Sequence, residues 1–207
     1  MPLPEFQKAF AALVLDARFA QRVREQGEAA LAGWGLSERE ARRLARATRQ
    51  PGMSLNCTLA RVNRFAPIAE TWPMCCVVIE PRLREVLDAL WAQRPPQGYQ
   101  LNADVERFAQ RLQTDAVLRA QFPYLDDVYR YEAASNALAY ETRRLSAEEM
   151  QGRYLEVDLQ HDPAELLGPL LGHQAPPAGL PRRPHRVRIA LVDEAIESRW
   201  EPLEPPL

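Results

Sequence analysis

Histidines and paired carboxylates are the side chains of this sequence that could transfer protons or bind a metal. The histidines are His161, His173 and His185. Their spacing of 12 residues matches none of the zinc, di-iron or nucleophile-and-base motifs. Carboxylates are adjacent at Asp126-Asp127 and Glu148-Glu149, but neighbouring side chains on a helix point about 100° apart and do not converge on one substrate atom. We therefore expect these carboxylates to be solvated or to stabilise helix N-termini, and we predict no catalytic residue and no metal site.

The cysteines are few and unevenly placed, at Cys57, Cys75 and Cys76. The adjacent pair lies in an apolar run, where an unpaired cysteine usually packs as a small hydrophobic residue. Adjacent cysteines rarely bridge each other, because the resulting ring is strained. We therefore expect no disulfide framework, and a thiol or metal enzyme built on these three residues is kept only as an alternative.

The overall charge limits the classes of partner. The 207 residues include 26 basic and 28 acidic side chains, which give a net charge of -2. This balance produces no overall field that would hold nucleic acid or an anionic membrane. Residues 1–5 lack the basic and apolar regions of a secretory signal, and no apolar run approaches the roughly 18 residues that span a bilayer. We therefore expect a cytoplasmic protein in a reducing compartment, with no cofactor of its own.

An arginine-rich segment follows a capping-box motif. Ser37 and Glu40 have the spacing of that motif and predict a helix that spans residues 38–49. Its arginines are Arg39, Arg42, Arg43, Arg46 and Arg49. Such a helix can contact DNA phosphates as the recognition helix of a helix-turn-helix regulator does. Arginine is also the usual surface cation of this chain, so DNA binding is kept as the alternative function.

Apolar side chains recur at helical spacing through the first two thirds of the chain. Short helices are expected in residues 1–50 and longer ones in 51–145, including one from about Leu125 to Thr142. In the apolar stripe that begins at Leu55, we expect Pro67 to kink or end the helix near Phe65. Residues 95–98 contain two prolines and a glycine and predict a loop. We therefore predict two helical domains, residues 1–50 and 51–145.

From Arg153 onward the apolar period changes to two, which indicates strands. The predicted elements are strands over 154–159, 187–192 and 196–200 and a short helix over 163–171. A proline-rich loop is expected over 173–184 and a turn over 193–195, while residues 202–207 are expected to fray. The third domain is therefore residues 146–207. The fold class is α+β, a mainly helical N-terminal part followed by a three-stranded antiparallel sheet like that of winged-helix peptide-recognition domains.

A sheet of three strands leaves one edge of each outer strand unpaired. Such an edge can accept an extended peptide as an added strand, with backbone hydrogen bonds giving affinity and alternate side-chain pockets giving register. A purely structural sheet packed on the helices has the same alternation. The sequence does not distinguish the two edges.

Two stretches of the helical part resemble segments of a known family. The first, residues 61–73, has a central Arg-Phe pair and a closing aromatic-Pro pair, and the second, residues 122–132, begins aromatic-Pro-x-Leu and ends in Glu. With the predicted strand-helix-loop-strand-strand unit, they resemble accessory subunits of multinuclear iron-dependent oxidative enzymes in ribosomal peptide natural-product biosynthesis, of the methanobactin and 3-thiaglutamate pathway type. The resemblance covers residues 55–203. Residues 1–50 depart from this pattern, and residues 23–37 are similar instead to helical modules of small dioxygenase subunits and of some peptide leaders.

The resemblance implies a function divided between two proteins. In that family the iron enzyme holds the metals and oxidises a cysteine of a ribosomally made precursor peptide, while the accessory chain docks on the enzyme and presents the precursor. It therefore implies a heterodimer, iron in the partner enzyme and a peptide bound to the sheet of this chain. The implied peptide-binding residues are Tyr154, Leu155, Val157, Leu159, Val187, Arg188, Ile189, Leu191, Ile196 and Trp200. The implied enzyme interface comprises Phe122, Tyr124, Asp126, Tyr129 and Arg130.

Overall fold

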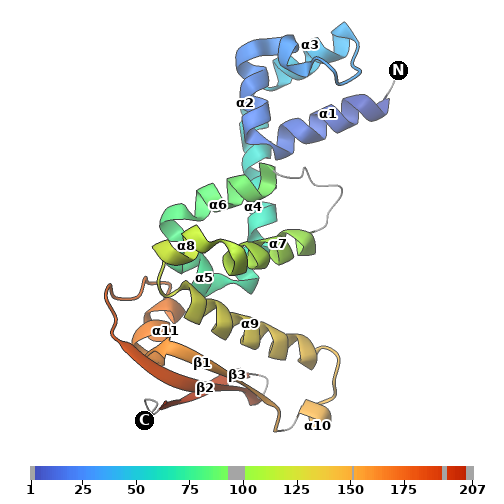
Figure 1. The fold of residues 1–207 in the computed structure, drawn as a ribbon. Helices are drawn as coiled ribbons and strands as arrows, with labels where there is room; N and C mark the ends of the chain where they lie inside the picture. Colours follow the sequence, from blue (N-terminus) through green and yellow to red (C-terminus); the bar gives the residue numbers. More distant parts are fainter. Residues whose placement is uncertain (1–2, 93–100, 151, 193–194, 204–207) are drawn as a thin grey trace. The chain divides into compact units, whose positions relative to one another are not determined.

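The structure, a computed structural model, describes residues 3–92, 101–150, 152–192 and 195–203 (Figure 1). The loop predicted at 95–98 and the tail at 204–207 lie outside these residues, as does most of the turn predicted at 193–195. Contacts divide the chain into two compact units, which are Met1–Pro67 with Glu85–Val105 (unit 1) and Ile68–Arg84 with Glu106–Leu207 (unit 2). The domain boundaries predicted near residues 50 and 145 stay a prediction.

Unit 1 begins with short helices, some of which start at a side-chain cap. They are α1 (Leu3–Leu15), α2 (Ala17–Gln26), the 3-10 turn Gly27–Leu31 and α3 (Glu38–Ala47). The Asp16 carboxylate accepts the Phe19 N–H at 2.9 Å and starts α2, and the predicted capping box of Ser37 and Glu40 is confirmed at the start of α3. These helices share a hydrophobic core that includes Leu13, Phe19, Val23, Leu31 and Leu44.

A long helix, α4 (Pro51–Thr71), follows, and two more helices are α6 (Glu80–Ala92) and α7 (Leu101–Thr114). Helix α4 continues through Pro67, so of the two expected outcomes, a kink or an end near Phe65, the end is wrong and the kink stays a prediction. A proline inside a helix removes one backbone hydrogen bond. Here Arg64 and Ile68 on either side are buried, and Arg64 is held by the Asp104 carboxylate at 2.8 and 3.1 Å. Their packing offsets the missing bond.

Unit 2 contains the sheet and the helices around it. Its further elements are α5 (Pro73–Val78), α8 (Ala116–Gln121), α9 (Leu125–Thr142), α10 (Ala147–Met150), β1 (Tyr154–His161), α11 (Pro163–Leu171), β2 (Arg182–Val192) and β3 (Ala195–Pro202). Strand β2 begins at Arg182, inside the predicted loop 173–184. It extends there because His185 pairs with Pro202, and the Leu203 N–H donates to the Pro184 carbonyl at 2.8 Å.

The three strands are antiparallel in the order β1-β2-β3, with β2 in the centre. The predicted α+β fold with a three-stranded antiparallel sheet is confirmed. Helix α9 lies across one face of the sheet and packs mainly on β1 and β2 (Figure 1). Helix α11 contacts β1 and α5. The sheet therefore has one face toward α9, called the inner face below, and an opposite outer face.

Candidate functional site

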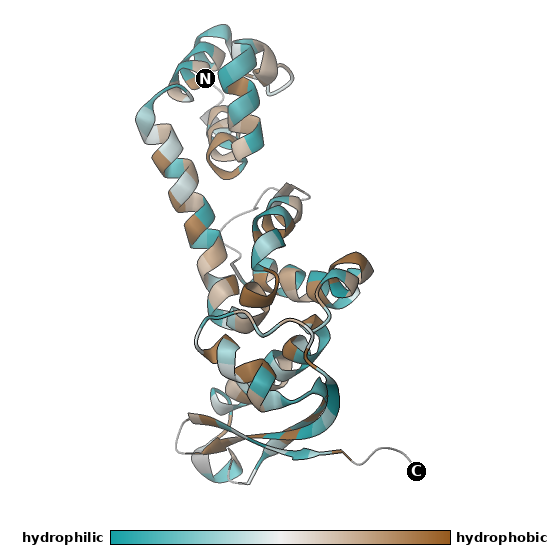
Figure 2. Ribbon diagram, turned by 90° about the vertical axis from the view of Figure 1, so that its left-hand side faces the viewer, coloured by the Kyte–Doolittle hydropathy of each residue, from teal (hydrophilic) through white to brown (hydrophobic). Residues whose placement is uncertain are grey.

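Most of the predicted peptide-binding residues share the inner face of the sheet. Paired residues of antiparallel strands point to the same side, and the register pairs Leu155 with Ile189, Val157 with Val187, and Leu191 with Ile196. Leu159 and Trp200 follow the same alternation on β1 and β3. Both hydrophobic and hydrophilic residues occur along the strands, as the colouring in Figure 2 shows.

Three of these inner-face residues are closed off from any ligand. Leu159, Val187 and Ile189 are each 0% exposed beneath the helices. Strand β2 also has a partner on both sides, so its backbone cannot accept another strand. These three residues stabilise the unit as core, and Leu155, Val157 and Leu191 are half-buried beside them.

The inner face is uncovered along β3. Ile196 is 37% exposed and Trp200 is 46% exposed, although both side chains project from the side of the sheet that α9 occupies. Between them, the Ser198 hydroxyl lies 2.9 Å from the Tyr131 hydroxyl of α9. On β3, two large apolar side chains thus lie on either side of a polar link to α9. This strand is at the edge of the sheet and pairs with β2 alone among the described strands.

The outer face of the sheet carries paired charges. Arg188 donates to Glu156 at 2.9 Å, and its guanidinium lies 4.1 Å from the ring centre of Tyr154. Arg186 donates to Asp158 at 2.9 Å, and this hydrogen bond lowers the pKa of the Asp158 carboxyl. Tyr154 and Arg188, both predicted peptide contacts, therefore lie on the face opposite Ile196 and Trp200.

The backbone of β1 is bonded by α9 near its C-terminal end. Asp127 Oδ2 accepts the backbone N–H groups of Gln160 at 2.8 Å and His161 at 3.1 Å, and the His161 Nδ1 lies 2.8 Å from the same oxygen. Arg130 donates to the Asp158 carbonyl at 3.2 Å. Asp127 is only 2% exposed and lies in the first turn of α9, so of the two expected roles the solvated carboxylate is wrong and the acidic residue at a helix N-terminus is confirmed. Its partners are on a strand more than 30 positions away along the chain.

Tyr124, predicted to contact the partner enzyme, instead holds the proline-rich loop. It is buried, its hydroxyl donates to the Pro177 carbonyl at 3.0 Å, and the same hydroxyl accepts the Leu180 N–H at 2.7 Å. Its ring meets the His161 ring edge-on, with centroids 4.9 Å apart. This residue is therefore part of the internal structure of unit 2.

The other predicted interface residues also have internal contacts, apart from Phe122, which is half-buried. Tyr129 stacks on Trp72 with centroids 5.2 Å apart. Asp126 accepts from Arg119, and this hydrogen bond lowers the pKa of the Asp126 carboxyl. Arg130 donates to β1, as described above. The stretch 122–132 therefore organises unit 2 from within.

A buried carboxylate joins α9 to α5. Glu132 accepts the N–H groups of Met74 at 2.6 Å and Cys75 at 2.9 Å, and burial raises the pKa of its carboxyl. Burial also raises the pKa of the Cys75 thiol, and that of Cys76 to about 12. The nucleophilic form of cysteine is the thiolate, so these two thiols are held in the unreactive form.

Cys57, His173 and His185 lie in different elements of the chain. Burial raises the pKa of the Cys57 thiol, which lies 3.5 Å from the Leu13 carbonyl. His185 is buried in β2, where its Nδ1 lies 2.7 Å from the Arg183 carbonyl, and His173 is exposed. In the described parts of the chain, no cluster of three or more His, Cys, Asp or Glu side chains could hold a metal ion. Among the described helices, none is long and apolar enough to cross a membrane.

The arginines of α3 have varied surroundings. Arg42 donates to Glu28 at 3.3 Å, and the Arg43 guanidinium lies 5.9 Å from the ring centre of Phe6. Arg39 and Arg46 are exposed. DNA binding by this helix stays a prediction. No model of a known protein family matches this chain, and no curated protein sequence matches it either.

Proposed function

We propose that this chain is a non-catalytic subunit that binds a precursor peptide along β3 and docks on a multinuclear iron-dependent oxidative enzyme. The peptide is ribosomally made, and the enzyme oxidises one of its cysteines. The observation that carries the proposal is the free edge of β3, which is bordered on the inner face by the exposed side chains of Ile196 and Trp200.

The choice of edge follows from the backbone partners of each strand. Strand β2 is paired on both sides, and β1 is bonded at its C-terminal end by Asp127 and Arg130. In the described residues, no side chain hydrogen-bonds to the backbone of β3. An extended peptide can therefore pair with β3 as a fourth strand, using backbone groups that have no other partner.

The side chains beside β3 indicate what the peptide should contain. Alternate residues of an added strand point to the inner face, where Ile196 and Trp200 offer apolar surface. One turn beyond Tyr131, α9 carries the small residues Ala134 and Ser135, which leave room on that side of the helix. A segment with apolar residues at every second position fits this surface.

The contribution of such a subunit to the reaction is positional. A peptide held next to the enzyme presents its cysteine at an effective concentration in the millimolar range for a short flexible connection. The iron belongs to the partner enzyme, and this chain supplies neither a cofactor nor a catalytic group. We place the complex in the cytoplasm, where ribosomally made precursors are available.

Docking on an enzyme needs exposed apolar surface, and α4 provides some. Leu55 is 59% exposed, Leu59 49% and Val62 53%, and their spacing places them on one face of the helix. Contiguous exposed apolar side chains often mark protein interfaces. This stripe supports the docking part of the proposal better than the internally bonded residues of 122–132 do.

The peptide-binding part is tested with a short synthetic peptide that has apolar residues at every second position and one cysteine, as the surface beside β3 predicts. The fluorescence anisotropy of the labelled peptide should rise when the full chain is added. Trp200→Ala should weaken binding by at least about tenfold, because a central aromatic contact is lost. Arg199→Ala, on the outer face of the same strand, should bind like the wild type. Absence of binding, or equal weakening by both variants, would contradict the proposal.

For the docking part, a tagged full chain is co-expressed with the products of its neighbouring reading frames, and a multinuclear iron enzyme is sought in the purified complex. Leu59→Glu places a charge in the apolar stripe of α4 and should abolish recovery of the enzyme. Asn56→Glu adds the same charge to the same helix outside the stripe and should leave recovery unchanged. If the wild-type chain recovers no iron enzyme, the docking part of the proposal is wrong.

A further inference from the structure

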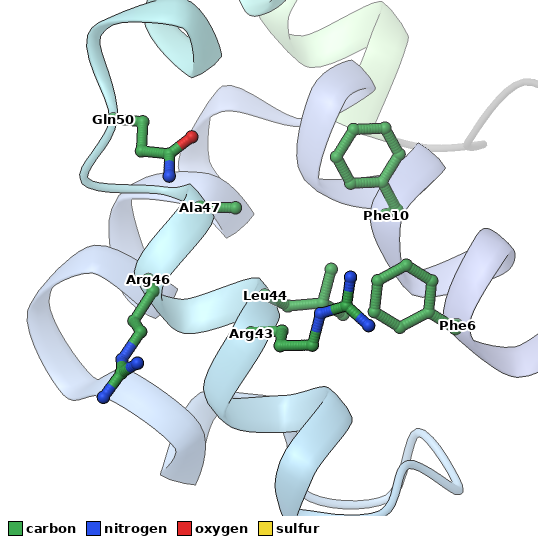
Figure 3. A pocket seen from close by; sticks show the side chains of 7 residues that line it. All are labelled: Phe6, Phe10, Arg43, Leu44, Arg46, Ala47 and Gln50. Carbon is green, nitrogen blue, oxygen red and sulfur yellow. The ribbon is translucent and has the colours of Figure 1, made fainter.

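Unit 1 contains an open cavity of about 390 Å³ between α1 and α3 (Figure 3). One wall is aromatic and consists of Phe6 and Phe10, one helical turn apart on α1. The other wall consists of Arg43, Leu44, Arg46 and Ala47 on α3. Its volume falls within the range of about 300 to 1,000 Å³ that is usual for ligand pockets.

The inside of this cavity is apolar and open to solvent. Phe10 is 39% exposed, whereas Leu44 is 1% exposed and belongs to the core of unit 1. Exposed apolar surface costs free energy in water. A ligand that covered Phe10 and the neighbouring part of Phe6 would recover this free energy.

The charges around the cavity are positive. The Arg43 guanidinium lies beside the Phe6 ring, and the Arg46 side chain extends from the same wall away from the rings (Figure 3). Arg46 has no ion-pair partner within the described residues. Arg43 faces Glu40, whose carboxyl is engaged mainly by Ser37 hydrogen bonds. None of the described residues that line the cavity is acidic, so carboxylates of a ligand would be attracted to this rim.

The two walls match the spacing of a helix. Phe6 and Phe10 are four residues apart, and so are Arg43 and Ala47. Parallel rows at this spacing accept the apolar stripe of an amphipathic helix, as in helix-in-groove recognition. We infer that this groove binds an acidic amphipathic helix of another polypeptide, with its apolar side chains on Phe6 and Phe10 and its carboxylates beside Arg43 and Arg46.

Duplex DNA fits this groove less well than such a peptide. Its bases are stacked inside the duplex, its phosphates need cationic donors but gain nothing from an aromatic hollow, and the neighbouring Arg42 is paired with Glu28. The inference uses only contacts within unit 1. It does not depend on the peptide proposed for β3.

The probe is a short fluorescein-labelled synthetic helix with Leu and Phe on one face and Glu on the flanks. It should bind the full chain saturably in an anisotropy titration. Two control peptides should bind at least about tenfold more weakly. A twin with Lys in place of Glu loses the charge complementarity, and a scrambled peptide of the same composition loses the continuous apolar face.

Variants of the chain locate the site. Arg43→Glu combined with Arg46→Glu should weaken binding of the acidic probe at least about tenfold. Phe10→Ala, which leaves the charges unchanged, should also weaken binding. Arg24→Glu combined with Arg49→Glu makes the same charge change on exposed residues outside the cavity and should have little effect. Circular dichroism checks that each variant is folded.

Several results would overturn the inference. They are the absence of saturable binding, equal binding of the Lys twin, or equal weakening by the Arg24 and Arg49 control. Displacement of the probe by duplex DNA, with the control variant weakened as well, would assign this surface to nucleic acid. A dimer of the wild-type chain that Phe10→Ala dissociates, together with no saturable binding of the probe to the wild type, would assign it to a second copy of the chain. Trp200→Ala should bind the probe normally, which separates this site from β3.

Discussion

The two outer strands of the sheet, β1 and β3, differ in the hydrogen bonds that α9 makes to them. Near the C-terminal end of β1, α9 supplies the Asp127 carboxylate and the Arg130 guanidinium to the backbone. On β3, the link to α9 runs between the side chains of Ser198 and Tyr131 and leaves the backbone free. Apolar and polar residues alternate in the same way along both strands. The difference between their free edges therefore comes from α9, which bonds to the backbone near the end of β1 and, in the described residues, not to the backbone of β3.

The largest expected effect comes from removing the carboxylate that bonds β1. Asp127→Ala leaves the buried N–H of His161, the partly buried N–H of Gln160 and the His161 ring without their acceptor. We expect a loss of about 4 kcal/mol in the free energy of unfolding, measured by urea denaturation. Amide exchange at Gln160 and His161 should become faster.

The adjacent residue is the matched control for that prediction. Asp126 pairs with Arg119 at the surface, with both side chains about two-fifths exposed. Exposed ion pairs contribute little to stability. Asp126→Ala should therefore unfold close to the wild type. Equal losses in the two variants would show that Asp127 does not act through the β1 edge.

The second largest effect is expected from removing the Glu132 carboxylate, which joins α9 to α5. Glu132→Ala leaves the Met74 and Cys75 N–H groups buried without an acceptor, and we expect a loss of about 3 kcal/mol by urea denaturation. Glu132→Gln keeps one acceptor oxygen and should lose less. If the alanine variant were as stable as the wild type, α9 would be held in place without this carboxylate.

Glu132 should also make stability depend on pH. Burial raises its pKa in the folded protein above the ordinary value of 4.5. Its contribution to the free energy of unfolding is therefore fully present below pH 4.5 and is lost as the pH rises through the raised pKa. The stability of the wild type relative to Glu132→Gln should fall over that interval, as measured by urea denaturation at a series of pH values. A constant difference would contradict the raised pKa.

A smaller effect should appear in amide exchange of the intact protein. Alternate amides of β3 point away from β2 and have no strand partner, so they should exchange faster than those of Gln160 and His161. Binding of the precursor peptide should slow exchange in β3 by about tenfold for each 1.4 kcal/mol of added protection. Protection that appeared in β1 instead would reverse the choice of edge.

The smallest effect is expected on the outer face. Arg188→Ala removes the contacts with Glu156 and Tyr154, but its side chain is 55% exposed. Water and salt screen such pairs, so the melting temperature should remain within experimental error. A substantial loss would mean that the charges of the outer face, as well as α9, hold β1 in place.

Many local elements follow directly from sequence patterns. The caps at Asp16 and Ser37 depend on residues three positions apart, and both are present. The change of apolar period after Arg153 correctly placed β1. Patterns failed at Pro67 and at Arg182, where packing and strand pairing with distant residues extended an element past a local breaker.

The roles of individual residues in 122–132 could not be predicted in the same way. Three side chains of this stretch bond to backbone groups at least 33 positions away along the chain: those of Tyr124, Asp127 and Glu132. The neighbours of these residues in the sequence do not reveal such distant partners. Phe6 and Arg43 likewise look, in the sequence, like one apolar residue and one cation on separate helices. Only the tertiary structure of unit 1 places them beside each other in the lining of one cavity.

By itself, the sequence determined the fold class, the helix caps and the alternation of the strands, because these depend on residues within a few positions of one another. The tertiary structure decided which side chains of the sheet are covered and which edge stays free. It did so because the direction of α9 across the sheet brings Asp127 to the backbone of β1 and leaves Ile196 and Trp200 of β3 uncovered.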